Sequence, residues 1–169
     1  SHLPQHGKVA MEYSPMGVLP RVTKIDGGTL ELVRSLGVEV VTSANLIQYA
    51  TQRWSDKELD SHLKASEILT TTVKEAFNFI SENLDTNLTE FEVAEFIRNR
   101  FTESNLITPD GPVVAINNHA TDPHFEPTEA NSSTMSKGDW VLIDLWGRIG
   151  DEPSVCADIT WTAFIGDQV

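Results

Sequence analysis

Two aspartates lie inside runs of apolar residues near the end of the chain. Asp144 falls within the run 140–146 and Asp158 within the run 157–164. A carboxylate among apolar side chains costs free energy unless its charge is compensated, and a divalent cation compensates it efficiently. If the two runs pair as a hairpin, both carboxylates can lie side by side on one face, where their repulsion requires a cation or a shared proton. The pair therefore indicates a metal site.

Each aspartate taken alone has a simpler explanation. Aspartate often caps a turn or accepts backbone hydrogen bonds at the end of a strand. For either residue by itself, that structural role is the better interpretation. For the pair, with Asp158 inside the sequence Ala-Asp-Ile-Thr-Trp-Thr at 157–162, metal binding is favoured.

The two runs resemble the strand pair of the pita-bread metallopeptidases, the family of Xaa-Pro aminopeptidases, prolidases and creatinase-like proteins. Members typically show Asp-x-Gly followed by Ser-Asp-Ile-Thr-Arg-Thr. This chain has Val-Leu-Ile-Asp at 141–144 and Ala-Asp-Ile-Thr-Trp-Thr at 157–162. The resemblance implies that Asp144 binds one metal ion and that Asp158 bridges two.

Two histidines lie in the polar loop 117–137 that precedes the first aspartate. A single loop histidine is commonly just a solvated side chain, and that alternative stays open. The segment 118–125, however, resembles the family's loop ending in His-Tyr, whose histidine stabilises the reacting carbonyl. His124 matches that position, so the resemblance implies a catalytic role for it. His119 stands where the family often has Asn and is a candidate for binding the substrate.

The chain departs from the family pattern in three places. Trp146 displaces the Gly of Asp-x-Gly by one position, the turn between the aspartates is longer than usual, and Trp161 stands where Arg is frequent. These differences bear on substrate preference. The family's other ligands, one His and two Glu, lie beyond its Asp-Ile-Thr run, and only eleven residues follow Asp158 here. We therefore expect this chain to carry part of the active site and to be inactive alone.

The pattern of apolar residues predicts the elements that position these side chains. The capping boxes Ser-Asp-Lys-Glu at 55–58 and Thr-Glu-Phe-Glu at 89–92 each predict the start of a helix. Short apolar runs at 112–116, 140–146 and 157–164 predict an antiparallel sheet. The first helix is expected to bury Leu59, Leu63, Leu69, Val73, Ala76, Phe77 and Ile80, and the second Phe91, Val93, Phe96, Ile97 and Phe101.

The first fifty residues follow the order strand, helix, strand, helix, which is typical of an α/β layer with parallel strands. Strands are expected at 8–13 and 38–41, with a helix at 29–36 that stops at Gly37. Residues 1–53 resemble the C-terminal part of the creatinase-type N-terminal domain. Residues 54–169 resemble the first half of the pita-bread domain, so the expected fold class is α+β.

Composition excludes several functional classes. The chain has 12 basic and 25 acidic residues, a net charge of −13, and no basic run, so nucleic acid is not an expected partner. It lacks an apolar stretch of about 20 residues and a signal peptide, so we expect a soluble, cytoplasmic protein with no membrane association. The single cysteine, Cys156, is expected to be a small core residue. Half a sheet leaves an open edge and uncovered apolar surface, so we expect that this fragment forms a homo-oligomer, associates with another partner, or was cut from a longer chain.

The function implied by the resemblance is hydrolysis of Xaa-Pro peptides with two divalent metal ions. Oxygen ligands favour hard cations such as Mn²⁺, with Zn²⁺ or Co²⁺ as alternatives. A second interpretation is a non-catalytic module that binds peptides or proteins on the same fold. A third, creatine-type amidinohydrolysis, runs without metal and leaves the paired aspartates unexplained.

Overall fold

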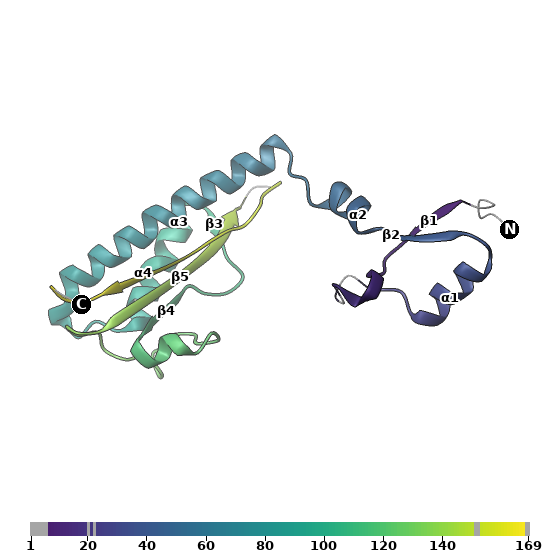
Figure 1. Ribbon diagram of the computed structural model, residues 1–169. Helices are drawn as coiled ribbons and strands as arrows, with labels where there is room; N and C mark the ends of the chain where they lie inside the picture. Colours follow the sequence, from purple (N-terminus) through teal and green to yellow (C-terminus); the bar gives the residue numbers. More distant parts are fainter. Residues whose placement is uncertain (1–6, 20, 22, 151–152, 168–169) are drawn as a thin grey trace. The chain divides into compact units, whose positions relative to one another are not determined.

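The computed structural model describes residues 7–19, 21, 23–150 and 153–167 of the 169. The chain divides into two compact units, Ser1–Trp54 and Ser55–Val169 (Figure 1). The mixture of helices and sheets confirms the expected α+β class. Each unit is described by itself below.

The first unit contains two parallel strands. Strand β1 (Lys8–Met11) pairs with β2 (Glu39–Thr42), and the chain between them forms the 3-10 turn η1 (Pro15–Gly17) and helix α1 (Gly27–Ser35). Helix α1 begins two residues earlier than expected, because the Asp26 side chain accepts a hydrogen bond from the Thr29 N–H and caps it. Gly37 follows the helix with φ +84°, as expected for a residue that ends it. Helix α2 (Ala44–Thr51) comes after β2.

The second unit begins with two helices whose starts the capping boxes predicted. Helix α3 (Asp56–Asn83) follows the reciprocal bonds between Ser55 and Glu58, and α4 (Glu90–Glu103) follows the same arrangement between Thr89 and Glu92. Each box satisfies backbone N–H groups that have no partner within the helix. The short turn η3 (Leu84–Thr86) connects the two helices.

The sheet of this unit is antiparallel, as predicted, and β5 (Trp140–Ile149) is its central strand. It pairs with β3 (Leu106–Ile107), β4 (Val113–Ile116) and β6 (Ala157–Phe164). Strand β5 extends three residues beyond the predicted run, far enough to pair with β3. The turn η4 (Asn117–Thr121) opens the long loop between β4 and β5.

Helices α3 and α4 cover one face of this sheet (Figure 1). Side chains along β5 alternate between the two faces, so Val141, Ile143 and Leu145 are buried in the core against the helices. The residues between them, including Asp144, lie on the opposite face, which α3 and α4 leave uncovered. This uncovered side is called the open face below.

The first turns of α3 are packed differently from the prediction. Leu59 and Leu63 are 47% and 58% exposed, and the buried positions there are Ser61 and Ala65. The reason is that a polar turn, rather than the apolar sheet, covers this end of the helix. The Ser61 hydroxyl accepts a hydrogen bond from the Val155 N–H at 3.0 Å.

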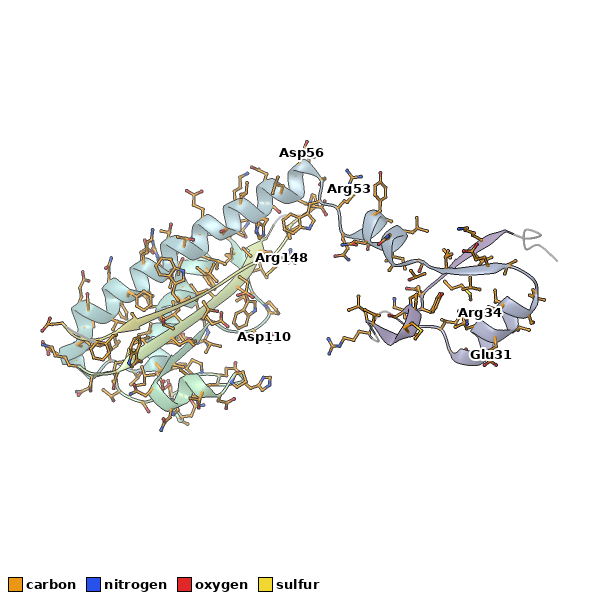
Figure 2. The ribbon with its side chains drawn as sticks, in the orientation of Figure 1. Glu31, Arg34, Arg53, Asp56, Asp110 and Arg148 are labelled. Carbon is orange, nitrogen blue, oxygen red and sulfur yellow. The ribbon has the colours of Figure 1, made fainter. Side chains whose placement is uncertain are left out.

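The expectation that Cys156 is a core residue is wrong, because the same turn holds it at the surface. Cys156 lies just before β6 and is exposed, not a core residue. Its carbonyl oxygen is 2.8 Å from Nδ1 of His62 on α3. Arg148, which lies near the end of β5 and is labelled in Figure 2, donates a hydrogen bond to the Ser154 hydroxyl of this turn at 2.9 Å. The turn is thus held by main-chain and polar contacts, which leave the thiol outside.

Within the described residues, no helix combines the length and the apolar character that crossing a membrane would require.

Candidate metal centre

Asp144 and Asp158 lie on the open face of the β5–β6 hairpin. In the register of these strands, Asp144 is opposite Thr160 and Trp146 is opposite Asp158. The two aspartates are therefore diagonal neighbours on the same face rather than directly opposed. Diagonal neighbours of an antiparallel pair are about 7–8 Å apart, close enough for two carboxylates to share bound cations.

The two carboxylates are less buried than the apolar residues beside them in the sequence suggest. Although each aspartate is flanked by apolar residues, Asp144 is half-buried and Asp158 is exposed. The alternation of a strand explains this, because the flanking apolar side chains point to the helix-covered face. The pair thus faces solvent, where a cation and a substrate can reach it.

One oxygen of Asp144 is already oriented by a neighbour. The hydroxyl of Thr160, directly opposite on β6, donates to Asp144 Oδ1 at 2.5 Å. A charge-assisted hydrogen bond of this length restricts the rotation of the carboxylate. Thr160 is part of the Ala-Asp-Ile-Thr-Trp-Thr sequence, so the same short segment supplies one carboxylate and orients the other.

The electrostatic environment disfavours negative charge on Asp158. Although much of this side chain is open to solvent, the surrounding sheet removes part of its water shell. This desolvation, and secondarily the charge of Asp144, raise the pKa of the Asp158 carboxyl above its ordinary value of 3.8. A cation near both carboxylates would oppose both effects, so the donor set fits a hard divalent metal ion.

A pocket of about 260 Å³ lies on the open face beside Asp144. The segment 120–123 of the β4–β5 loop forms one wall, and the sheet forms its floor. Such a hollow could receive a small group next to the carboxylate. Its lining consists of Val113, Ala115, Ala120, Thr121, Asp122, Pro123, Leu142, Asp144 and Thr160.

His124 directly follows, in the sequence, the segment 120–123 that forms one wall of this pocket. Its side chain is exposed, and its backbone N–H donates to Asp122 Oδ1 at 2.9 Å. The imidazole is therefore carried on a turned segment next to the pocket, and it is not among the lining residues. The structure brings the loop to the same face as Asp144 but leaves the His124 ring outside the pocket itself.

His119 has a different environment from His124. Its Nδ1 lies 2.8 and 2.9 Å from the two carboxylate oxygens of Glu90, and its ring stacks on Phe125 with centroids 4.3 Å apart. Glu90 is completely buried, whereas His119 is 32% exposed. His119 is thus engaged with the start of α4, and it does not line the pocket beside Asp144.

Neither Glu90 nor the orienting role of Thr160 was predicted from the sequence. Glu90 occupies the same helical stripe as buried Val93, Ala94 and Ile97. A charged residue in an apolar stripe is a detectable signal, since a buried carboxylate needs partners. The capping box drew attention to Glu92 instead, which satisfies the helix start at the surface.

Trp146 fills the position at which the family pattern has glycine. Its ring lies over Gly111, so that a Cβ added there would come within 2.5 Å of the indole. Gly111 also has φ +76°, a conformation that L-amino acids rarely adopt. Trp146 is accommodated on the open face because its neighbour has no side chain.

Across the residues that the structure describes, no group of three or more His, Cys, Asp or Glu side chains is arranged to hold a metal ion. Asp144 and Asp158, the two expected ligands, thus lie on one face without a third such side chain grouped with them among these residues.

Comparison with solved structures gives the same fold. The prolidase from Thermococcus sibiricus superimposes with a TM-score of 0.57 at 20% identity over 86% of this chain, and the prolidase from Pyrococcus furiosus with 0.58 at 22% over 83%. The chain covers 38% and 42% of those two structures.

A third structure is an X-prolyl aminopeptidase from Caenorhabditis elegans, described as a cytosolic enzyme with a di-nuclear active site. It matches with a TM-score of 0.57 at 24% identity, over 79% of this chain and 22% of that one. Like the two prolidases, it places this chain within the pita-bread fold.

Comparison of sequences points to the same group. A methionine aminopeptidase from Archaeoglobus fulgidus is 30% identical over 113 residues, which make up 67% of this chain and 36% of that protein. The chain therefore spans only about a third of this relative. The profile of metallopeptidase family M24 matches residues 60–169, the whole second unit except its first turn. This chain belongs to metallopeptidase family M24.

Proposed function

We propose that the protein containing this chain is a metal-dependent exopeptidase that hydrolyses Xaa-Pro peptide bonds, and that this chain supplies part of its active site. The observation that carries the proposal is the placement of Asp144 and Asp158 on one open face of the β5–β6 hairpin. The prolidases and the X-prolyl aminopeptidase among its structural relatives motivate the substrate class.

Each residue of the site has a distinct part in this proposal. Asp144 and Asp158 would hold two divalent ions, with Mn²⁺ preferred by oxygen ligands and Zn²⁺ or Co²⁺ as alternatives. Such ions supply a hydroxide near neutral pH and polarise a carbonyl. Thr160 keeps Asp144 oriented through its hydroxyl. His124 would donate a hydrogen bond to the carbonyl oxygen on which charge develops.

The experiment uses the full-length protein with Mn²⁺ and two peptides, one with proline and one with alanine at the second position after an N-terminal methionine. Release of the N-terminal residue from the proline peptide only is expected. Asp158→Ala should abolish the release. Asp85 is an exposed aspartate in the turn η3, and Asp85→Ala should leave the release unchanged.

Other outcomes assign the protein differently. Preferential cleavage of the alanine peptide would contradict the Xaa-Pro assignment and favour a methionine aminopeptidase, as in the relative from Archaeoglobus fulgidus. Equal activity in the Asp158→Ala variant would contradict the metal assignment. No cleavage of either peptide, together with no Mn²⁺ binding by calorimetry, would favour a non-catalytic peptide-binding module.

A further inference from the structure

Glu90 is a fully buried carboxylate at the first position of α4, and it joins the two ends of the β4–β5 loop. Its Oε1 accepts a hydrogen bond from the N–H of Ile116, the last residue of β4, at 2.7 Å. Its Oε2 accepts one from the N–H of Ser133, late in the loop, also at 2.7 Å. A buried carboxylate is costly unless such donors satisfy it, so these contacts resist separation.

The third partner of Glu90 lies within the loop itself. His119 approaches both carboxylate oxygens through Nδ1, at 2.9 and 2.8 Å. The face of the imidazole stacks on the Phe125 ring, with an angle of 26° between the two rings. Phe125 is buried and directly follows His124 in the chain. A continuous series of contacts therefore leads from Glu90 through His119 and Phe125 to the backbone of His124.

The segment between His119 and Phe125 is closed by short-range hydrogen bonds. The Asp122 N–H donates to the His119 carbonyl at 3.1 Å, and the Phe125 N–H donates to the Asp122 carbonyl at 3.1 Å. The His124 N–H donates to Asp122 Oδ1 at 2.9 Å. Because these turns connect the two stacked rings, a displacement of His119 would be transmitted to the peptide that carries His124.

We propose that Glu90 and His119 are positioning residues, which set the direction in which the loop presents the His124 imidazole next to the pocket that Asp144 lines. A catalytic role for the oriented imidazole rests on the proposed function. The orientation of the loop by Glu90 and His119 does not depend on it. In this arrangement, His119 acts through Phe125 and the backbone, and it does not need to touch the substrate.

The inference is tested with three substitutions of His119 in the full-length protein. His119→Ala removes both contacts, His119→Gln keeps a donor for Glu90 but loses the stack, and His119→Phe keeps the stack but loses the donor. His62→Ala is the control, since that histidine contacts the turn before β6 instead. Hydrogen exchange at the amides of Asp122, His124 and Phe125 is measured, together with the NMR resonance of the His124 ring.

In His119→Ala, exchange at these three amides is expected to accelerate about tenfold or more, with a shifted His124 resonance and unchanged exchange in β5. His119→Gln should lie closer to the wild type than His119→Phe does, because the bond to Glu90 anchors the loop. If His119→Phe restores the loop and His119→Gln does not, the role of Glu90 is refuted. Unchanged exchange in His119→Ala, or an equal effect of His62→Ala, overturns the proposal as a whole.

Kinetics separate positioning from a general loss of structure. Displacement of a catalytic group by about 1 Å can cost on the order of a hundredfold in rate. We therefore expect kcat of His119→Ala to fall by about tenfold to a hundredfold while KM for an Xaa-Pro peptide changes little. A rise in KM at constant kcat would contradict the proposal and indicate direct substrate binding by His119. If the protein cleaves no peptide, the proposed function fails. The exchange and NMR measurements still decide whether Glu90 and His119 orient the loop.

Discussion

Asp144 and Asp158 lie on the same face of one hairpin, displaced from each other by two positions along the strands. Their placement depends on register, because a shift of β6 by one residue would turn Asp158 toward the helix-covered core. Thr160, opposite Asp144, belongs to the same alternating set as Asp158. The hairpin therefore carries two carboxylates and an orienting hydroxyl in one fixed geometry.

The Thr160 hydroxyl should matter for metal binding although it is not proposed as a ligand. Thr160→Val keeps the shape of the side chain but removes the donor to Asp144, so the carboxylate becomes free to rotate. Loss of a group that orients a ligand typically costs about 10–100-fold in metal affinity. Calorimetric titration of the full-length protein with Mn²⁺ measures this change.

Two control variants accompany this titration. Thr160→Ser, which retains the hydroxyl, should bind Mn²⁺ nearly as tightly as the wild type. Thr162→Val changes a threonine on the same face, opposite Leu142, and should have little effect. Equal affinity of Thr160→Val and the wild type would show that the hydrogen bond does not support the site.

The raised pKa of Asp158 makes a prediction about stability without metal. A carboxyl whose pKa is higher in the folded state than in the unfolded state favours folding when protonated. This contribution is fully present below the unfolded value of 3.8 and is lost as the pH rises through the folded value. At pH 7, Asp158 therefore opposes folding, and Asp158→Asn should raise the Tm of the metal-free protein. The gain should disappear near pH 3.

Glu58 provides a control of opposite sign in the same unit. Its hydrogen bonds with the backbone and the side chain of Ser55 lower the pKa of its carboxyl, so the charged form stabilises the start of α3. Glu58→Gln should consequently lower the Tm at pH 7. If both variants shifted the Tm in the same direction, the explanation from local electrostatics would be wrong.

The contact between Trp146 and Gly111 predicts a destabilising substitution at a residue that is not a proposed ligand. Gly111→Ala would place a Cβ 2.5 Å from the indole, well inside van der Waals contact, in addition to straining a backbone with φ +76°. We expect a loss of about 2–4 kcal/mol in the free energy of unfolding, from backbone strain of about 1 kcal/mol and overpacking of about 1–3 kcal/mol. Urea unfolding measures this loss.

Gly138→Ala separates the two contributions. Gly138 has φ +98°, but nothing lies within 4 Å of a Cβ built there, so only the backbone strain applies. In a Trp146→Ala background, the cost of Gly111→Ala should fall to about that of Gly138→Ala. An unchanged cost in that background would show that the indole is not responsible.

The sequence predicted most of the second unit because its signals are local. Both capping boxes mark helix starts with side-chain to backbone bonds only three residues apart, and the alternation in β5 distinguishes its two faces. The diagonal placement of the aspartates follows from the pairing register of β5 and β6. This register could not be predicted from the sequence, because the turn between the two strands is long.

Other features depend on contacts between distant segments, which local patterns do not encode. Leu59 fits an apolar stripe, but that end of α3 meets a polar turn about 94 residues away in the chain, through Ser61 and Val155. Glu90 is buried because the backbone of β4 and of the loop both reach it. The role of His119 likewise depends on this distant carboxylate.

Whether Asp144 and Asp158 hold metal ions can be read from the metal content of the purified protein. Full-length protein is saturated with Mn²⁺, freed of excess ions, and analysed by mass spectrometry of the metal. We predict two ions per chain in the wild type, a loss of both in Asp158→Ala, and a loss of one or both in Asp144→Ala. Retention of two ions per chain in a folded Asp158→Ala variant would show that Asp158 is not a metal ligand.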